Sequence, residues 1–226
     1  MIKTALIFAA GRGERLRPLT DLVPKPMFLV RGVPLIEHLV LQLTHAGIEH
    51  IVINHAYLGS QIRRHLKKGQ AFGVEISYSP EPPGALETGG GIIQALPLLG
   101  SNPFMTVSSD IITDYPFATL KLTEIAPIHL VLVAKQVHTL NADFSLNEHQ
   151  HVITGSKTMT FSNIACFHPK IFEDRQLRRF RFTQLLQPFI EKQKVSGEFY
   201  AGKWLDTGSV ERLKQAETLV ARLYER

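Results

Sequence analysis

Short apolar runs alternate with helical patterns over the first third of the chain. Apolar runs over residues 5–10, 51–54 and 74–78 predict strands, and apolar positions at helical spacing over 34–47 and 58–69 predict two helices between them. Strands and helices that alternate with short links indicate right-handed crossovers and a mostly parallel sheet. The predicted fold class is therefore α/β, and ligands are expected at the carboxyl ends of the strands.

The remaining two thirds of the chain contain more strand patterns than helical ones. Apolar runs predict strands over 104–107, 128–134 and 159–167, and a polar stretch between the last two predicts a hairpin turn near His149 and His151. Cys166, in the last of these strands, is expected to be an inert core thiol.

Two helices are predicted from their start signals. Thr88 is expected to be the N-cap of a helix with Ile92, Ile93 and Leu96 on its apolar face. A hairpin around Gly202, over residues 198–205, is expected to lead into a C-terminal helix that Ser209 caps.

Composition narrows the class of protein. The 226 residues are 44% hydrophobic and 20% charged, which is typical of a globular protein, and the apolar runs are too short to span a bilayer. A single cysteine excludes an internal disulfide framework and favours the reducing cytoplasm. The net charge of +5 suits small anionic substrates, and no basic stripe carries interleaved aromatic residues. We therefore expect neither nucleic acid nor a membrane as partner.

A glycine turn followed by fixed cations comes directly after the first predicted strand. Gly11 and Gly13 allow the backbone to turn tightly and to approach a ligand. The cations that follow are Arg12, Arg15, Arg17 and Lys25. Exposed backbone N–H groups and cations are what a polyphosphate requires. The common phosphate loops do not match, because a Walker Gly-Lys-Ser/Thr ending is absent and Leu16 replaces the third glycine of a dinucleotide fingerprint.

The same stretch carries a family resemblance. Residues 10–20, Ala-Gly-Arg-Gly-Glu-Arg-Leu-Arg-Pro-Leu-Thr, followed by Pro24-Lys25-Pro26, resemble the signature of sugar-1-phosphate nucleotidyltransferases. Ser108-Ser109-Asp110 stands where that family has Asn-Gly-Asp or Asn-Ser-Asp, and Trp204, Asp206 and Gly208 fit the end of its catalytic domain. Ser108 in place of the usual Asn leaves the contacts of that Asn open.

The resemblance implies a fold and a domain plan. The expected fold is a three-layer, Rossmann-like nucleotide-diphospho-sugar transferase fold, with a mostly parallel central sheet and a small antiparallel extension on the sugar side. A single nucleotidyltransferase domain is expected over 1–226. It would consist of a nucleotide-binding half (1–110), a sugar-binding half (111–205) and a C-terminal helix (206–226).

The resemblance also implies roles for individual residues. Asp110 and Asp206 would bind Mg²⁺ as the cofactor, and Arg15 and Lys25 would be catalytic together with Asp110. From its own position alone, a cap of the following turn would be the favoured interpretation of Asp110, although a carboxylate at a strand end is well suited to a hard cation. Asp143 and Asn163 would read sugar hydroxyls, whereas the strand of Asn163 could also be an ordinary core strand. The implied nucleotide-binding residues are Ala10, Gly11, Arg12, Gly13, Glu81, Gly84, Ala85, Thr88 and Gly89.

Three consecutive glycines, residues 89–91, stand in the first turn of the helix predicted after Thr88. Each costs about 1 kcal/mol relative to alanine in a helix. Either bare backbone lies beside a ligand there, or the helix packs closely against a neighbouring segment.

The expected reaction joins a nucleoside triphosphate to a sugar 1-phosphate and releases pyrophosphate. The segment 86–91, Leu-Glu-Thr-Gly-Gly-Gly, resembles that of family members that act on N-acetylmuramate 1-phosphate, which favours UTP as the nucleotide and a role in peptidoglycan recycling. GTP with mannose 1-phosphate, and dTTP or UTP with glucose 1-phosphate, stay open.

Two other function classes, a glycosyltransferase and a non-catalytic sensor, fit the sequence less well. A glycosyltransferase would usually show an Asp-x-Asp motif, whereas Asp110 and Asp114 are four residues apart. A non-catalytic nucleotide-sugar sensor should have lost Lys25 or one of the aspartates. The sequence does not define an oligomeric state.

Overall fold

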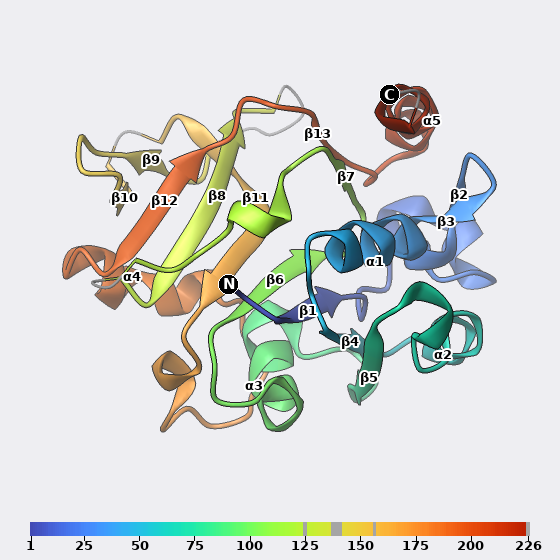
Figure 1. The fold of residues 1–226 in the computed structure, drawn as a ribbon, viewed down its shortest axis with the longest axis horizontal. Helices are drawn as coiled ribbons and strands as arrows, with labels where there is room; N and C mark the ends of the chain where they lie inside the picture. Colours follow the sequence, from blue (N-terminus) through green and yellow to red (C-terminus); the bar gives the residue numbers. More distant parts are fainter. Residues whose placement is uncertain (124–125, 137–141, 156, 225–226) are drawn as a thin grey trace.

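The computed structural model describes residues 1–123, 126–136, 142–155 and 157–224 (Figure 1). A seven-stranded sheet, in the order β12-β8-β11-β6-β1-β4-β5, forms its centre. Its strands are β1 (Thr4–Phe8), β4 (His50–His55), β5 (Glu75–Pro80), β6 (Phe104–Ser108), β8 (Ile128–Ala134), β11 (Met159–Phe167) and β12 (Val195–Phe199). β11 is antiparallel to both of its neighbours, and the other neighbouring pairs are parallel. The predicted α/β class with a mostly parallel sheet is confirmed.

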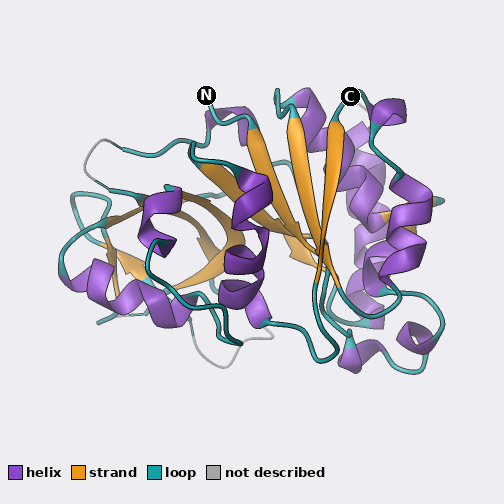
Figure 2. Ribbon diagram, turned by 90° about the horizontal axis from the view of Figure 1, so that it is seen from below, coloured by secondary structure: helices purple, strands orange, loops and turns teal. Residues whose placement is uncertain are grey.

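Helices lie on both sides of the strands (Figure 2). The α-helices are α1 (Leu35–His45), α2 (Gly59–Leu66), α3 (Glu87–Leu99), α4 (Thr183–Glu191) and α5 (Val210–Tyr224). α1 and α2 pack on one face of the sheet, where Ile7 and Ile53 belong to the same buried cluster. α3 and α4 pack on the opposite face, beside Leu6. Because both faces are covered, the strands read as nearly continuous apolar runs.

Short elements complete the fold. Three two-stranded sheets pair β2 (Leu29–Val30) with β3 (Val33–Pro34), β7 (Ile111–Thr113) with β13 (Trp204–Asp206), and β9 (Ser145–Leu146) with β10 (Val152–Ile153). The 3₁₀ turns are η1 (Glu14–Leu16), η2 (Leu19–Asp21), η3 (Lys25–Met27), η4 (Gln70–Phe72), η5 (Phe117–Thr119) and η6 (Pro169–Phe172). The β9–β10 pair confirms the turn predicted near His149.

The hairpin predicted over 198–205 is wrong. β12 pairs in parallel with β8 in the central sheet, whereas β13 pairs antiparallel with β7 in a separate sheet. The segment around Gly202 therefore carries the chain from one sheet to another. Asp114 fixes this crossing, because its Oδ1 accepts the Lys203 N–H at 2.6 Å. A glycine flanked by two strand patterns does not by itself identify the partner of either strand.

The N-cap predicted at Thr88 is also wrong. α3 begins two residues earlier than predicted, at Glu87, with Leu86 in the N-cap position. The hydroxyl of Thr88 accepts the backbone N–H of Phe182 at 3.1 Å, so it joins α3 to the segment before α4. The predicted cap at Ser209 is confirmed, since Ser209 Oγ accepts the Arg212 N–H at 3.3 Å. Cys166 is fully buried, as predicted, and burial raises the pKa of its thiol.

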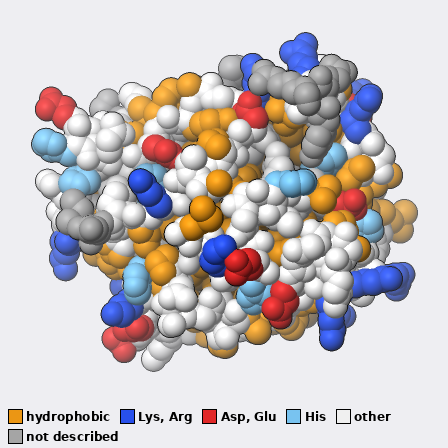
Figure 3. Space-filling model, viewed as in Figure 1, with side chains coloured by type: hydrophobic (Ala, Val, Ile, Leu, Met, Phe, Trp, Pro, Cys, Tyr) orange, Lys and Arg blue, Asp and Glu red, His pale blue; other side chains and the backbone are white. Residues whose placement is uncertain are grey.

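None of the helices in the described ranges has the length and apolar character needed to cross a lipid bilayer. On the face drawn in Figure 3, the described Lys and Arg side chains do not form a continuous stripe, and some of them lie beside Asp or Glu.

Candidate active site

The candidate residues come from loops that follow several parallel strands. The glycine turn with Gly11 follows β1, Glu81 follows β5, and Asp110 follows β6. β5, β4, β1 and β6 run in the same direction, so their carboxyl ends meet at one edge of the sheet. This is the edge where open parallel sheets bind ligands.

Lys25 and Asp110 form an ion pair at this edge. Lys25 lies in η3, and its Nζ donates to Asp110 Oδ2 across 85 positions of sequence. The side chains are 11% and 27% exposed, respectively, so the pair is largely shielded but still open to a ligand.

Asp206 is held from two directions. Its Oδ2 accepts a hydrogen bond from Nη1 of Arg212 at 2.8 Å, and its Oδ1 accepts the Gly208 N–H at 3.1 Å. Arg212 belongs to the first turn of α5 and its side chain is 11% exposed. The sequence analysis missed Arg212. A usable signal exists, because a cation in the first turn of a helix opposes the helix dipole and therefore needs an acidic partner.

The two aspartates lie on adjoining segments. In the β7–β13 ladder Asp206 pairs with Ile111, the residue after Asp110. Beyond the ladder, the N–H and the hydroxyl of Thr207 both donate to the backbone oxygen of Asp110, at 2.8 and 3.0 Å. The main chain beside Asp206 is thus hydrogen-bonded to the main chain of Asp110, although the two aspartates are 96 positions apart in the sequence.

Gly208 lies among three charged groups. A Cβ at this position would lie 2.5 Å from Arg212 Nη2, 2.7 Å from Asp206 Oδ1 and 2.9 Å from Arg15 Nη2. A side chain at this position would require the charged groups around it to move. The same distances show that the exposed Arg15 extends from the glycine turn to Asp206, so the structure brings Arg15, Lys25, Asp110 and Asp206 into one region.

The glycine turn has one constrained glycine and one open one. Gly13 has a left-handed φ of 71°, and a Cβ there would lie 2.9 Å from Thr20 Cγ2. A Cβ at Gly11 would meet nothing within 4 Å, so the space above its backbone is free for a ligand.

Arg12 braces the turn from within the chain. Its guanidinium donates to the Thr20 oxygen at 2.7 Å and to Asp21 Oδ1, and lies 3.9 Å from the centre of the Tyr57 ring. The hydrogen bond from Arg12 lowers the pKa of the Asp21 carboxyl. A phosphate contact by Arg12 stays a prediction, and the described contacts show a bracing role.

Glu81 is buried in a network that supports two loops. One carboxylate oxygen accepts a hydrogen bond from Asn54 Nδ2 at 2.6 Å, and the other accepts the Leu86 N–H at 2.7 Å. Asn54 Oδ1 in turn accepts the Ala9 N–H at 2.7 Å, which ties this network to the end of β1. Burial raises the pKa of Glu81. Sequence reasoning missed Asn54, whose signal is a polar side chain at the end of a buried strand.

Between Glu81 and α3 the backbone bends sharply, because Gly84 and Ala85 have left-handed φ values of 94° and 55°. Residues 89–91 then pack against the chain itself. The N–H groups of Gly89 and Gly90 both donate to the Phe180 oxygen, at 2.9 and 3.3 Å. Of the two explanations given for the three glycines, the structure therefore shows close packing.

Of the two residues predicted to bind sugar, Asn163 lies within β11 and Asp143 contacts that strand. Asn163 has a left-handed φ of 60°, at a bulge where the pairing of β11 with β8 shifts register. Bulges re-aim side chains and are frequent beside active sites. The carboxylate of Asp143 accepts the Phe161 N–H at 2.9 Å. Trp204 joins β11 to β13, the strand that carries Asp206, because its Nε1 donates to the Ser162 oxygen at 3.0 Å.

Few acidic side chains at the site could act as ligands of a metal ion. Within the described ranges no group of three or more His, Cys, Asp or Glu side chains is arranged to hold a metal. Asp110 and Asp206 are two hard oxygen donors on adjoining segments, which fits Mg²⁺, because this ion is commonly held by one or two carboxylates together with substrate phosphates and water.

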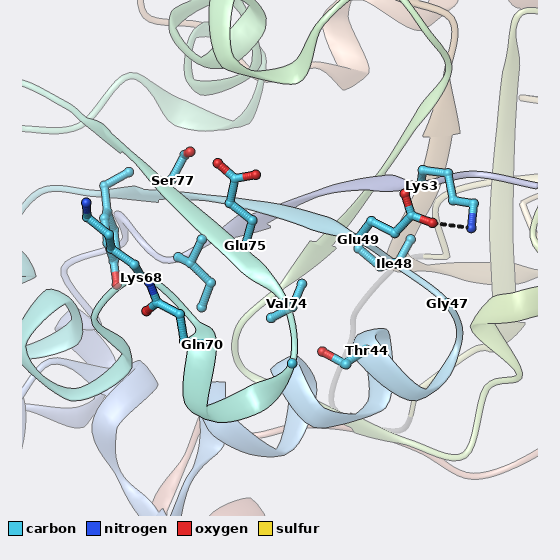
Figure 4. Close-up of a pocket in the computed structure, with 13 residues that line it drawn as sticks. Lys3, Thr44, Gly47, Ile48, Glu49, Lys68, Gln70, Val74, Glu75 and Ser77 are labelled. Carbon is cyan, nitrogen blue, oxygen red and sulfur yellow. Dashed lines mark hydrogen bonds and ion pairs between the residues drawn. The ribbon is translucent and has the colours of Figure 1, made fainter.

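A surface pocket of about 930 Å³ lies elsewhere (Figure 4). Lys3, Glu49 and Val74, which line it, stand at the amino ends of β1, β4 and β5. Lys3 and Glu49 form an ion pair at 2.6 Å across it. The residues of the candidate active site do not line this pocket, which is at the opposite edge of the sheet.

The fold and this arrangement define a class of enzyme. Residues 4–139 match the model of the nucleotidyl transferase family, and the chain belongs to that family. The prediction of a sugar-1-phosphate nucleotidyltransferase is confirmed by its relatives.

The relatives agree in reaction class and differ in substrate. The chain is 45% identical over 224 residues to the N-acetylmuramate alpha-1-phosphate uridylyltransferase of Neisseria meningitidis serogroup B, covering 95% of this chain and 97% of that protein. It is 34% identical over 116 residues to the mannose-1-phosphate guanylyltransferase of Mycobacterium tuberculosis, covering 51% and 32% of the two chains. A UDP-glucose pyrophosphorylase solved with UDP-glucose has the same fold, with a TM-score of 0.80 at 19% identity over 99% of this chain and all of that one.

Proposed function

We propose that this enzyme transfers the uridylyl group of UTP to N-acetylmuramate 1-phosphate. The observation that carries the proposal is 45% identity, over nearly the whole of both chains, to the Neisseria enzyme of that name. The segment 86–91, with its three glycines, supports the same assignment. We further propose that the enzyme works in the cytoplasm, in the recycling of peptidoglycan sugars, and the single cysteine fits a reducing compartment.

The reaction forms one bond and breaks another at the α-phosphorus. An oxygen of the sugar 1-phosphate attacks this phosphorus, the bond to the β-phosphate breaks, and pyrophosphate leaves. The attacking oxygen is already anionic, so no general base is needed. The main obstacle is repulsion between two polyanions, which cations and accurate positioning overcome.

The residues of the site fit this task. Asp110 and Asp206 would hold Mg²⁺, which when bound supplies charge neutralisation at the α-phosphate. Lys25 lies against Asp110 and would contact the α-phosphate or the incoming sugar phosphate. Arg15 and the backbone of Gly11 and Gly13 would hold the β- and γ-phosphates.

Other predicted residues would bind the base of the nucleotide and the sugar. The loop of Gly84 and Ala85 would face the base, and Glu81 would hold this loop in place from beneath rather than contact the base itself. Asn163 and Asp143 would contact the sugar. The division into a nucleotide-binding half (1–110) and a sugar-binding half (111–205) belongs to this proposal.

A substrate panel tests the proposal. Pyrophosphate release is measured with Mg²⁺ for UTP, GTP and dTTP, each with N-acetylmuramate 1-phosphate, mannose 1-phosphate and glucose 1-phosphate. We expect kcat/KM to be highest for UTP with N-acetylmuramate 1-phosphate, by about tenfold or more, which corresponds to about 1.4 kcal/mol of transition-state binding. A higher value for GTP with mannose 1-phosphate would move the assignment to that substrate pair.

A further inference from the structure

Two buried threonines join the ends of the β7–β13 ladder. This ladder has three residue pairs, from Trp204 with Thr113 to Asp206 with Ile111. Thr113 and Thr207 have no exposed surface. At one end Thr113 Oγ1 donates to the Lys203 oxygen at 2.7 Å, and at the other Thr207 Oγ1 donates to the Asp110 oxygen at 3.0 Å.

The two ends differ in what lies beside them. The end with Thr207 carries both aspartates. Asp206 belongs to the last pair of the ladder, and Asp110 lies one residue outside it. The end with Thr113 leads to Asp114 and Tyr115, and the hydroxyl of Thr113 also accepts the Tyr115 N–H at 3.1 Å. A ladder of only three residue pairs has few backbone hydrogen bonds of its own, so the bonds at each end add to the packing that holds that end closed.

Thr207 therefore joins the main chains that carry the two carboxylates. Its N–H and its hydroxyl converge on the same oxygen, that of Asp110, while its own backbone continues from Asp206. The N–H contact survives any substitution other than proline, whereas the hydroxyl contact depends on the side chain. With both bonds in place the main chain at Asp206 cannot shift along that at Asp110.

We propose that Thr207 is a positioning residue that fixes the spacing of Asp110 and Asp206 for the metal-bound triphosphate. The inference rests on the proposed function only in that both carboxylates hold the metal. Thr207 does not itself contact substrate. If the ladder opened at this end, the two carboxylates would take up a range of separations. Binding one ion with both would then require them to be ordered first, which lowers the affinity for the ion.

Thr207→Val tests the proposal, with Thr113→Val as the matched control. Both changes replace a fully buried threonine at one end of the same ladder by an isosteric apolar residue, and the control removes two side-chain hydrogen bonds where the test variant removes one. Thermal unfolding measures the effect of each on stability. Affinity for Mn²⁺ together with UTP, followed by electron paramagnetic resonance of free Mn²⁺, measures the metal site without turnover.

We expect Thr207→Val to weaken Mn²⁺ binding, and to raise the Mg²⁺ concentration for half-maximal pyrophosphate release, by about threefold to tenfold, the worth of one hydrogen bond. Thr113→Val should lower the unfolding temperature at least as much and leave metal affinity unchanged. Thr207→Ser, which keeps the hydroxyl, should restore metal affinity.

Unchanged Mn²⁺ affinity in Thr207→Val would overturn the proposal, and so would equal weakening in both valine variants. Failure of the proposed function has a different signature, because the wild-type protein would then show no Mg²⁺-dependent pyrophosphate release with any substrate pair. The Mn²⁺ measurement decides the role of Thr207 in either case.

Discussion

At the scale of single residues, opposite charges at the site are already paired before any substrate binds. Lys25 contacts Asp110, and Arg212 contacts Asp206 at 2.8 Å. Each aspartate is thereby given a cationic partner and oriented, since an isolated buried carboxylate is costly. A triphosphate with its metal would change the partners of Lys25, while Arg212, in the first turn of α5, would stay in place to hold Asp206.

Lys25→Ala is expected to lower kcat by at least about tenfold, or about 1.4 kcal/mol of barrier, because a cation next to the reacting phosphates is lost. Steady-state pyrophosphate release with saturating substrates measures the effect. Lys3→Ala is the control, since Lys3 forms an ion pair with Glu49 at the opposite edge of the sheet and should leave kcat unchanged. A Lys25→Ala enzyme with kcat within a factor of two of the wild type would remove Lys25 from the transition state.

A second residue-scale prediction concerns acid stability. The imidazole of His129, 3.9 Å away, and then the hydrogen bond from Tyr115 lower the pKa of Glu198 below its usual 4.5. A lowered carboxyl pKa in the folded state stabilises the protein above about pH 4.5, and this contribution is lost as the pH falls through the folded-state pKa. The difference in melting temperature between the wild type and Glu198→Gln should thus be largest near pH 7 and shrink toward pH 3. A difference that is constant over this range would contradict the assignment.

At the scale of elements, the strands were predictable and their partners only partly so. Apolar runs identified β6, β8 and β11 within one or two residues, because strands covered on both faces must be apolar throughout. The apolar pattern of a short strand does not identify its partner, and for this reason β12 and β13 were wrongly joined into a hairpin. Likewise, Thr88 has the composition of an N-cap, but its hydroxyl is used by the Phe182 N–H.

The packing of α3 gives an element-scale prediction. A Cβ at Gly90 would lie 2.3 Å from the backbone oxygen of Arg178, so the segment before α4 would have to move. Gly90→Ala should therefore destabilise the protein by about 1 to 3 kcal/mol, although alanine favours a helix over glycine by about 1 kcal/mol. Urea unfolding measures the change, with Gly155→Ala, where a Cβ meets nothing within 4 Å, as the control. An increase in stability for Gly90→Ala would contradict this prediction, because it would show that the segment around Arg178 moves aside at little cost.

At the scale of the whole molecule, the sheet gathers three distant segments at one edge. The glycine turn, Asp110 and Asp206 were predictable because each lies in a short motif at the end of a strand. Asn54 and Arg212 have local signals that were missed. Thr207 has none, because its importance depends on a contact with a residue 97 positions away. Such contacts exist only once the sheet order is fixed, and no local pattern encodes that order.

The account depends on Asp110 and Asp206 serving one magnesium-bound triphosphate, and one measurement tests this most directly. Mg²⁺-dependent pyrophosphate release from UTP and N-acetylmuramate 1-phosphate is compared for the wild type, Asp110→Asn and Asp206→Asn, with thermal unfolding to show that each variant is folded. Each substitution keeps the shape of the side chain and removes its charge. We predict that each lowers kcat by about a hundredfold or more, or about 2.7 kcal/mol. Folded variants that turn over at nearly the wild-type rate would contradict the account.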